Sequence, residues 1–436
     1  MKRLIDSNLK QWKESPLRKP LIVRGARQVG KTHSVVEFGK TAFKNCVNLD
    51  LEKRRDLHAL FSGNLGAAKL LSQLELALEC RIAPGETLLF LDEVQSCPRA
   101  IMALRYFFEE CPQLHVIAAG SLLEFALSEA SFPVGRVQFL EMNPMTFAEY
   151  LQALGKDRAA AEILSVPKAL AESVHELLME DLRSYFLVGG MPASVRAFTE
   201  TGSIRQAFEV QAELSKGFRQ DFLKYAPRAD ADCLEAVLEG AARNLGGQVL
   251  YTRLAEGHAH TTNHRAFDLL RRARLLTKVL VADPSSLPLG ASAATHRFKA
   301  LLLDIGLWRH LCGGGVEHEV RRGDLLEVRR GAAAEQFVGQ ELRAAQGSDP
   351  YYWSREARGS NAEVDFLAVV EGRICGIEVK SGAAGRLRSL HMLLAAYPAL
   401  AGGYVFSSRP YAELPAQKLS FLPLYYAYSA AAPKIQ

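Results

Sequence analysis

A short loop bounded by glycines after an apolar strand constrains this chain more than any other feature. LIVR (21–24) predicts a buried strand, and the following GARQVGKT (25–32) matches the pattern G-x-x-x-x-G-K-[ST] in full. In this pattern backbone N–H groups wrap around phosphates before a helix begins, the lysine reaches the outer phosphates, and the last hydroxyl binds Mg²⁺. The residues predicted to bind the nucleotide are Gly25, Ala26, Arg27, Gln28, Val29, Gly30, Lys31, Thr32 and His33.

Two further apolar runs end in polar residues that belong beside this loop. LLFLDE (88–93) predicts a strand that ends in Asp92 and Glu93, and HVIAAGS (115–121) predicts a strand that ends in Ser121. In phosphoryl-transfer sites one acid at this place holds Mg²⁺, and a second polarises the attacking water. We therefore expect Asp92 to bind the metal, Glu93 to act as the base, and Ser121 to sense the outer phosphate. Acids that cap a strand end and a serine in an ordinary turn are the simpler alternatives.

Apolar runs alternate with helical patterns in the first part of the chain, which predicts an α/β fold with a parallel sheet. The predicted strands are LIVRG (21–25), CVNLD (46–50), TLLFLDE (87–93), HVIAAGS (115–121) and VQFLEM (137–142). Arg136 directly precedes the last run. It is the candidate for an arginine that stabilises charge on the transferred phosphoryl group, and a plain surface arginine is the alternative.

Length and composition limit the remaining possibilities. The chain has 436 residues, whereas a single core rarely exceeds roughly 250–300 residues. An apolar content of 48% and a net charge of +5 indicate a globular, mildly basic chain, which permits contact with nucleic acid without requiring it. The seven cysteines show no C-x-x-C spacing and fit a reducing compartment. No uncharged apolar run approaches about 18 residues, so we expect a cytoplasmic protein without membrane contact.

The middle of the chain reads as helix, turn, helix and then two apolar runs joined by a loop at 284–295. This order suggests a winged-helix unit, although other three-helix units share it. Basic residues gather at the second helix and just after it. They are Arg265, Arg271, Arg272, Arg274 and Lys278. A solvated helix face is the simpler interpretation, and a helix that reads DNA is the alternative.

Several segments together resemble prokaryotic AAA-type ATPases whose C-terminal half has no known function. They are GARQVGKT, LLFLDEVQ, AAGSLLEF, GRVQFLEMNPMTFAEYL and YFLVGGMP. The resemblance covers essentially the whole chain and implies that the protein binds and hydrolyses ATP with Mg²⁺. It also implies a winged-helix-like middle and a restriction-endonuclease-like end. Such ATPases often form rings, so an oligomer is possible, and Arg136 could act in its own subunit or in a neighbour. His33 stands where the family more often has Thr or Ser, and we expect little effect.

The sequence EVDFLAVVEGRICGIEVKSG (363–382) predicts a hairpin with its central Glu-Gly as a two-residue turn. This register sets Asp365 opposite Glu378 and Glu363 opposite Lys380, and the alternation of side chains puts Asp365, Glu378 and Lys380 on one face. Two opposed carboxylates repel by up to about 1 kcal/mol unless a cation or a proton separates them. A divalent metal would remove that repulsion, whereas a surface hairpin stabilised by a Glu363–Lys380 pair is the simpler interpretation.

This D…E-x-K arrangement resembles the PD-(D/E)xK nuclease superfamily. The resemblance implies that Asp365 and Glu378 hold Mg²⁺ and that Lys380 orients or activates water against a phosphodiester. Glu335, in the predicted helix AEQFVGQELRAAQ, matches the additional helical acid of that fold, with Glu341 as the alternative. A nuclease-like fold does not by itself imply an active nuclease.

The predicted fold is α/β, with four domains and a linker near 321–331. The domains are a P-loop ATPase domain with a parallel sheet (1–146), a helical lid (147–230), a winged-helix-like domain (231–326) and an α/β nuclease-like domain (327–436). Two functions fit this organisation. One is an ATP-hydrolysing motor or switch that acts on DNA or RNA, with the last domain cleaving or gripping a strand. The other is a switch that binds ATP or ADP and a protein partner, with a catalytically silent last domain.

Overall fold

The computed structural model separates the chain into two compact units, Met1–Asn143 and Pro144–Gln436. The residues that the structure describes are 1–63, 65–121, 123, 133–225, 230–312, 330–357, 360–380 and 387–432. The predicted domain boundary at 326/327 and all but the last two residues of the predicted linker at 321–331 lie outside these ranges.

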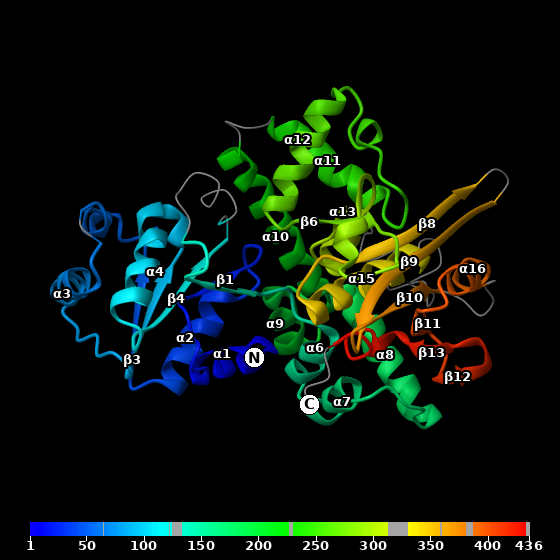
Figure 1. The fold of residues 1–436 in the computed structure, drawn as a ribbon, viewed down its shortest axis with the longest axis horizontal. Coiled ribbons are helices and arrows are strands. Elements are labelled where there is room, and N and C mark those ends of the chain that lie inside the picture. Colours follow the sequence, from blue (N-terminus) through cyan, green and yellow to red (C-terminus); the bar gives the residue numbers. More distant parts are fainter. Residues whose placement is uncertain are drawn as a thin grey trace. The chain divides into compact units, whose positions relative to one another are not determined.

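A five-stranded parallel sheet forms the centre of the first unit, in the order β2-β3-β4-β1-β5 (Figure 1). Its strands are β1 (Leu21–Arg24), β2 (Asn45–Asp50), β3 (Thr87–Asp92), β4 (His115–Gly120) and β5 (Gln138–Glu141). Every strand predicted for this region is confirmed, and each pairs with its neighbours in parallel. The apolar runs of β3 and β4 are buried along their whole length, as expected of strands covered on both faces.

Helices connect these strands and bury the sheet. They are α1 (Ile5–Glu14), α2 (Lys31–Ala42), α3 (Ala67–Leu78) and α4 (Pro98–Glu110). Leu70 of α3 and Leu104 of α4 share one buried apolar cluster with Leu89 and Leu91 of β3. Because β4 lies between β1 and β3, the carboxyl ends of these three parallel strands meet at one edge of the sheet. That edge carries the glycine-bounded loop, the acidic pair and Ser121.

The second unit begins with a run of helices. They are α6 (Phe147–Ala153), α7 (Asp157–Leu164), α8 (Glu172–Val188), α9 (Pro192–Thr201), α10 (Ile204–Tyr225), α11 (Ala231–Arg243), α12 (His260–Arg272) and α13 (Ile305–Leu311). The predicted helix stop at LVGGMP is confirmed, because α8 ends there and Gly189 has a φ of 72°. A Cβ on Gly189 would lie 2.3 Å from Oδ1 of Asp304, so only glycine fits this approach. Within the described ranges, no helix combines the length and apolarity needed to span a membrane.

One mixed sheet of eight strands occupies the rest of the second unit, in the order β12-β13-β11-β10-β9-β8-β6-β7 (Figure 1). The strands are β6 (Leu276–Val281), β7 (Ala294–Leu302), β8 (Tyr351–Ala357), β9 (Ser360–Val370), β10 (Arg373–Val379), β11 (Gly402–Ser407), β12 (Ala412–Leu414) and β13 (Leu419–Pro423). Two helices, α15 (Arg330–Gln346) and α16 (Arg388–Ala396), pack against it.

The hairpin predicted for the winged-helix region exists as the antiparallel pair β6 and β7. However, β6 also pairs in parallel with β8, so the sheet continues across the boundary predicted at 326/327. The winged-helix class therefore stays a prediction, as does the division of this unit into three domains. On α12, Arg271 and Arg272 both form ion pairs with Asp268, which fits a solvated helix face.

A buried carboxyl group links two helices of the second unit. Glu341 of α15 is 2% exposed, and its Oε1 accepts a 3.0 Å hydrogen bond from the backbone N–H of Phe147, the first residue of α6. Burial raises the pKa of Glu341 to about 8. Glu341 is therefore largely protonated at neutral pH.

We predict that this carboxyl group makes the stability of the second unit fall with rising pH. Because the folded pKa lies above the unfolded value, the contribution is complete below roughly pH 4.5 and is lost as the pH rises through about 8. Glu341→Gln keeps an oxygen acceptor but cannot ionise. Between pH 6 and pH 9 the wild type should lose about 2 kcal/mol more unfolding free energy than this variant, as measured by urea denaturation. Equal losses in both proteins would contradict the assignment.

Candidate functional site

The phosphate-binding loop connects β1 directly to α2, as predicted. Gly30 has a φ of 100° and α2 begins at Lys31. Gly25 is also required, because a Cβ at this position would lie 2.2 Å from the backbone oxygen of Met142. Inside the loop Ala26 and Val29 are buried and anchor it to the core. The N-terminus of α2 therefore faces the loop with free backbone N–H groups, which is the arrangement that binds phosphate.

Lys31 is buried in this loop, with 7% of its surface exposed. Its Nζ donates hydrogen bonds to the backbone oxygens of Gly25 at 3.0 Å and Ala26 at 2.8 Å. Burial lowers the pKa of Lys31 to about 8, although the neighbouring Glu93 and Asp92 raise it in part. Neutral carbonyl groups are its hydrogen-bond partners, so the ammonium charge is not neutralised by direct contact with a carboxylate.

The two residues predicted to hold Mg²⁺ at this site lie in direct contact. Oγ1 of Thr32 donates a 2.8 Å hydrogen bond to Oδ2 of Asp92. The other oxygen, Oδ1, accepts a 3.0 Å hydrogen bond from the backbone N–H of Glu93. Burial raises the pKa of Asp92, while the bond from Thr32 lowers it in part. A hydroxyl and a carboxylate oxygen side by side are donors that Mg²⁺ accepts, so these residues fit the ion.

Glu93, the second acid of the pair, lies next to Ser121 at the end of β4. Its Oε2 accepts hydrogen bonds from Nε2 of Gln95 at 2.5 Å and from Oγ of Ser121 at 3.4 Å. The predicted base and the predicted sensor residue are therefore brought together. Among the described residues Oε1 of Gln95 has no hydrogen-bond partner although it is buried, so this amide has a free acceptor for a water.

Sequence reasoning missed Gln95. In the sequence Gln95 is only a polar residue two positions after the acidic pair. Nothing there indicates that its side chain turns back toward Glu93 and Gly120. The packing is tight, because a Cβ on Gly120 would lie 2.2 Å from Oε1 of Gln95.

Arg136 does not lie beside the phosphate loop of its own chain. It directly precedes β5, whereas the loop follows the carboxyl end of β1, and the two strands are parallel. Arg136 therefore lies at the opposite edge of the sheet. Its Nε forms a 3.1 Å ion pair with Glu109, and the side chain is 46% exposed. A role in a neighbouring subunit stays a prediction.

The predicted hairpin of the second unit is confirmed in its turn and in its register. Glu371 and Gly372 both have positive φ values, 50° and 74°, as a two-residue type I′ turn requires. The ladder pairs Val370 with Arg373 and continues to Phe366 with Ile377. The next pair in this register is Asp365 and Glu378, and the backbone N–H of Val379 donates a 2.8 Å hydrogen bond to Oδ2 of Asp365.

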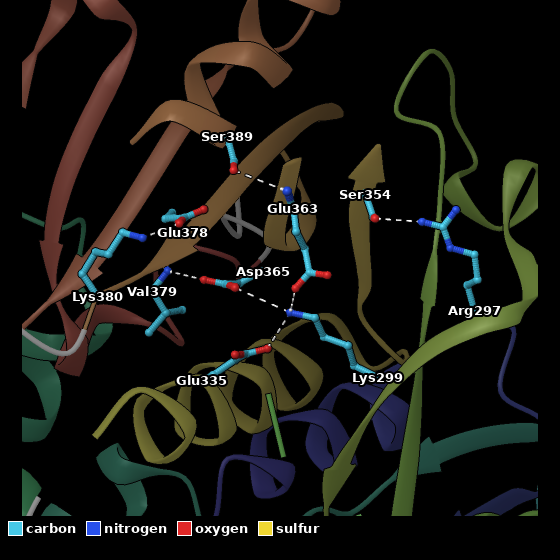
Figure 2. A network of polar contacts seen from close by, with 10 residues as sticks. All are labelled: Arg297, Lys299, Glu335, Ser354, Glu363, Asp365, Glu378, Val379, Lys380 and Ser389. Atoms are coloured by element: carbon cyan, nitrogen blue, oxygen red, sulfur yellow. Dashed lines mark hydrogen bonds and ion pairs between the residues drawn. The ribbon is translucent and has the colours of Figure 1, made fainter. Parts of the chain in front are cut away.

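A buried lysine that the sequence analysis did not identify lies among these acids (Figure 2). Nζ of Lys299, on β7, is 2.9 Å from Glu335, 2.6 Å from Glu363 and 3.5 Å from Asp365. Lys299 is 1% exposed. Nζ of Lys380 forms a separate 2.5 Å ion pair with Oε1 of Glu378. We call these six residues the carboxylate cluster: Lys299, Glu335, Glu363, Asp365, Glu378 and Lys380.

This geometry corrects one expectation. Glu363 pairs with Lys299, so the Glu363–Lys380 pair of the simpler interpretation is not what holds the hairpin. Throughout the ranges given above, no group of three or more His, Cys, Asp or Glu side chains is arranged to hold a metal ion. The metal site predicted for Glu335, Asp365 and Glu378 stays a prediction.

The electrostatics of the cluster follow from burial. Burial raises the pKa values of Glu335 and Glu378, while the ammonium groups of Lys299 and Lys380 lower them in part and favour the carboxylate forms. For Lys299 burial alone would lower the pKa, but Glu335, Asp365 and Glu363 outweigh it and raise the pKa above its ordinary value. The ammonium of Lys299 therefore stays charged over the whole physiological range.

The structure also separates the two candidates for the helical acid. Glu335 is in contact with Lys299, whereas Glu341 accepts a hydrogen bond from the backbone N–H of Phe147. The signal for Lys299 was a single lysine inside the apolar run FKALLLD (298–304). A lysine in a buried strand needs a partner of opposite charge. The sequence therefore predicts an acidic partner for Lys299 but does not identify the residue.

Three protein families match segments of the chain. An AAA domain matches residues 17–151, and two domains of unknown function, DUF8612 and DUF4143, match residues 179–317 and 330–425. Together with the geometry above, the first match identifies the N-terminal segment as an AAA-type P-loop ATPase domain. No curated protein matches the sequence.

Several solved structures are similar at low identity. A Walker-type ATPase of Pyrococcus abyssi has 15% identity and a TM-score of 0.46, with 70% of this chain and 94% of that chain covered. The Orc1 protein of Aeropyrum pernix in complex with DNA has 14% identity and a TM-score of 0.29, with 73% and 95% covered. The Holliday junction branch migration motor RuvB of Thermotoga maritima has 17% identity and a TM-score of 0.29, with 63% and 88% covered.

We predict that nucleotide affinity falls as Lys31 loses its proton. Phosphate binding requires the ammonium form, which exists in the free protein only below a pKa of about 8. The dissociation constant for ADP should therefore rise about tenfold between pH 7.5 and pH 9, as measured by calorimetry. Lys40→Met removes an exposed lysine of the same helix and should leave this pH dependence unchanged. An affinity that stays constant over this range would contradict the prediction.

Proposed function

We propose that the protein hydrolyses ATP in a Mg²⁺-dependent reaction and uses its nucleotide state to control the Pro144–Gln436 unit. The observation that carries the proposal is the 2.8 Å contact between Thr32 and Asp92, which joins the phosphate loop to the acidic strand end. Bound there, Mg²⁺ would neutralise charge on the outer phosphates. Thr32 and Asp92 would hold the ion, and Lys31 would exchange its carbonyl partners for phosphate oxygens.

Glu93 is the proposed base that orients and polarises the attacking water. Its carboxylate is positioned by Gln95 and Ser121, which contact one of its oxygens and leave the other, Oε1, for water. The free acceptor on Gln95 offers a second contact to the same water. Both contacts would orient the attacking water, and positioning together with electrostatic stabilisation supplies most of the catalysis in phosphoryl transfer.

The test of this proposal separates binding from turnover. Glu93→Gln should bind ATP with unchanged affinity and hydrolyse it at least about 100-fold more slowly, because a positioned base contributes about that much. Lys31→Ala should lose nucleotide binding itself. Turnover can be followed by phosphate release and binding by calorimetry in the same buffer. Normal hydrolysis by Glu93→Gln would overturn the assignment of the base.

A matched pair of variants tests whether Arg136 acts on a neighbouring subunit. Arg105 and Arg136 both form ion pairs with Glu109, so each change to alanine removes one of them. We predict that Arg136→Ala lowers turnover and Arg105→Ala does not, and that wild-type turnover rises with protein concentration. Equal activity of the two variants would assign Arg136 to the surface alone.

A second candidate function is nucleotide-dependent binding or processing of DNA or RNA by the Pro144–Gln436 unit. It is favoured by Asp365, Glu378 and Lys380, which share one face as in nucleases of the PD-(D/E)xK type. Single- and double-stranded DNA and RNA should then raise ATP turnover at low and at moderate salt. If no nucleic acid changes the turnover, the alternative becomes the better account, in which this unit binds a protein partner and is catalytically silent.

A further inference from the structure

Strand pairing on both sides fixes the backbone of Lys299. On β7 it pairs with Val279 of β6, and on its other side it bridges Gln248. Both neighbours hold the backbone, so the side chain extends from a strand rather than from a loop. Its ammonium group is buried, and the ring of Tyr352 lies 5.3 Å from it. The position of the charge is therefore set by the sheet.

The ammonium group of Lys299 occupies the position that a cation shared by Glu335, Glu363 and Asp365 would occupy. It contacts acids on two elements, Glu335 from α15 and Glu363 and Asp365 from β9 (Figure 2). An ammonium has three N–H donors, and here each donor can face one carboxylate. A metal ion that took these oxygens as ligands would have to displace a charge that the fold buries, and a buried ammonium without partners is strongly unfavourable.

We propose that Lys299 is the built-in cation of the carboxylate cluster, so that these acids bind no divalent metal and the chain has no Mg²⁺-dependent cleavage site there. The cluster keeps the arrangement of a nuclease-like hairpin, but a lysine from β7 supplies the positive charge. This inference concerns the second unit alone and does not depend on ATP hydrolysis by the first.

Lys299 and its three acids come from different segments of the chain. Lys299 belongs to the segment that matches DUF8612, whereas Glu335, Glu363 and Asp365 belong to the segment that matches DUF4143. The two segments are therefore connected both by the pairing of β6 with β8 and by the contacts of Lys299.

Luminescence of Tb³⁺ in the full-length protein, without nucleotide, tests this proposal. Tyr352 lies close enough to Lys299 to sensitise an ion bound in the position of the ammonium group. The wild type should show no saturable signal that depends on the cluster. Lys299→Met should melt roughly 10 °C lower and should gain a saturable Tb³⁺ signal together with recovery of the melting temperature. Lys278→Met, a half-buried lysine on the neighbouring β6, is the matched control and should gain neither.

A second measurement keeps the proposal falsifiable if Lys299→Met does not fold. Mn²⁺ binding to the wild type, followed by electron paramagnetic resonance, should be the same in Asp365→Asn. One Mn²⁺ bound by the wild type and lost in Asp365→Asn would overturn the proposal. A folded Lys299→Met variant that gains neither signal nor stability from Tb³⁺ would also overturn it.

Discussion

Each of the two units contains a buried lysine, and the two lysines differ in the charge of their partners. Lys31 donates to two backbone carbonyls, which carry no charge, and burial lowers its pKa to about 8. Lys299 contacts three carboxylates, which raise its pKa although it is more deeply buried. A buried ammonium gains most from an anion. Lys31 can therefore still gain an anionic partner when phosphate binds, whereas Lys299 already has protein carboxylates as its anionic partners.

This contrast bears on how the units divide their work. In the first unit Thr32 contacts Asp92 and Gln95 contacts Glu93, so these polar side chains gather at the edge of the sheet that carries the phosphate loop. In the second unit the sheet, α15 and the hairpin converge on charges that satisfy each other. We therefore propose that the chemistry of the protein belongs to its AAA domain and that the second unit holds a partner, whether nucleic acid or protein, rather than cutting one.

Much of the fold and part of the site could be predicted because the signals are local. The five strands of the first sheet are short apolar runs, and the turn at Glu371 and Gly372 sets the register of its hairpin. From that register the shared face of Asp365 and Glu378 follows. The phosphate loop is equally local, since its residues are consecutive and their spacing alone specifies the backbone.

The parts that sequence reasoning missed depend on tertiary contacts. Nothing near Lys299 in the sequence names Glu335 as its partner, because β7 and α15 meet only in the folded unit. The place of Arg136 likewise follows from the topology of the sheet, because a residue that precedes β5 lies at the edge opposite the loop that follows β1. The pairing of β6 with β8 also joins segments on either side of 326/327. Pairing between distant strands leaves little trace in local patterns.

The contrast between the two lysines is the central claim, and nuclear magnetic resonance of ¹³Cε-labelled lysine tests it most directly. The two signals can be assigned with Lys31→Arg and Lys299→Met and then followed from pH 6 to pH 10.5. The account predicts that Lys31 titrates near pH 8 and shifts when ADP is added. Lys299 should stay charged throughout and should not respond to Mg²⁺. A Lys299 signal that titrates within this range, or that moves on addition of Mg²⁺, would contradict the account.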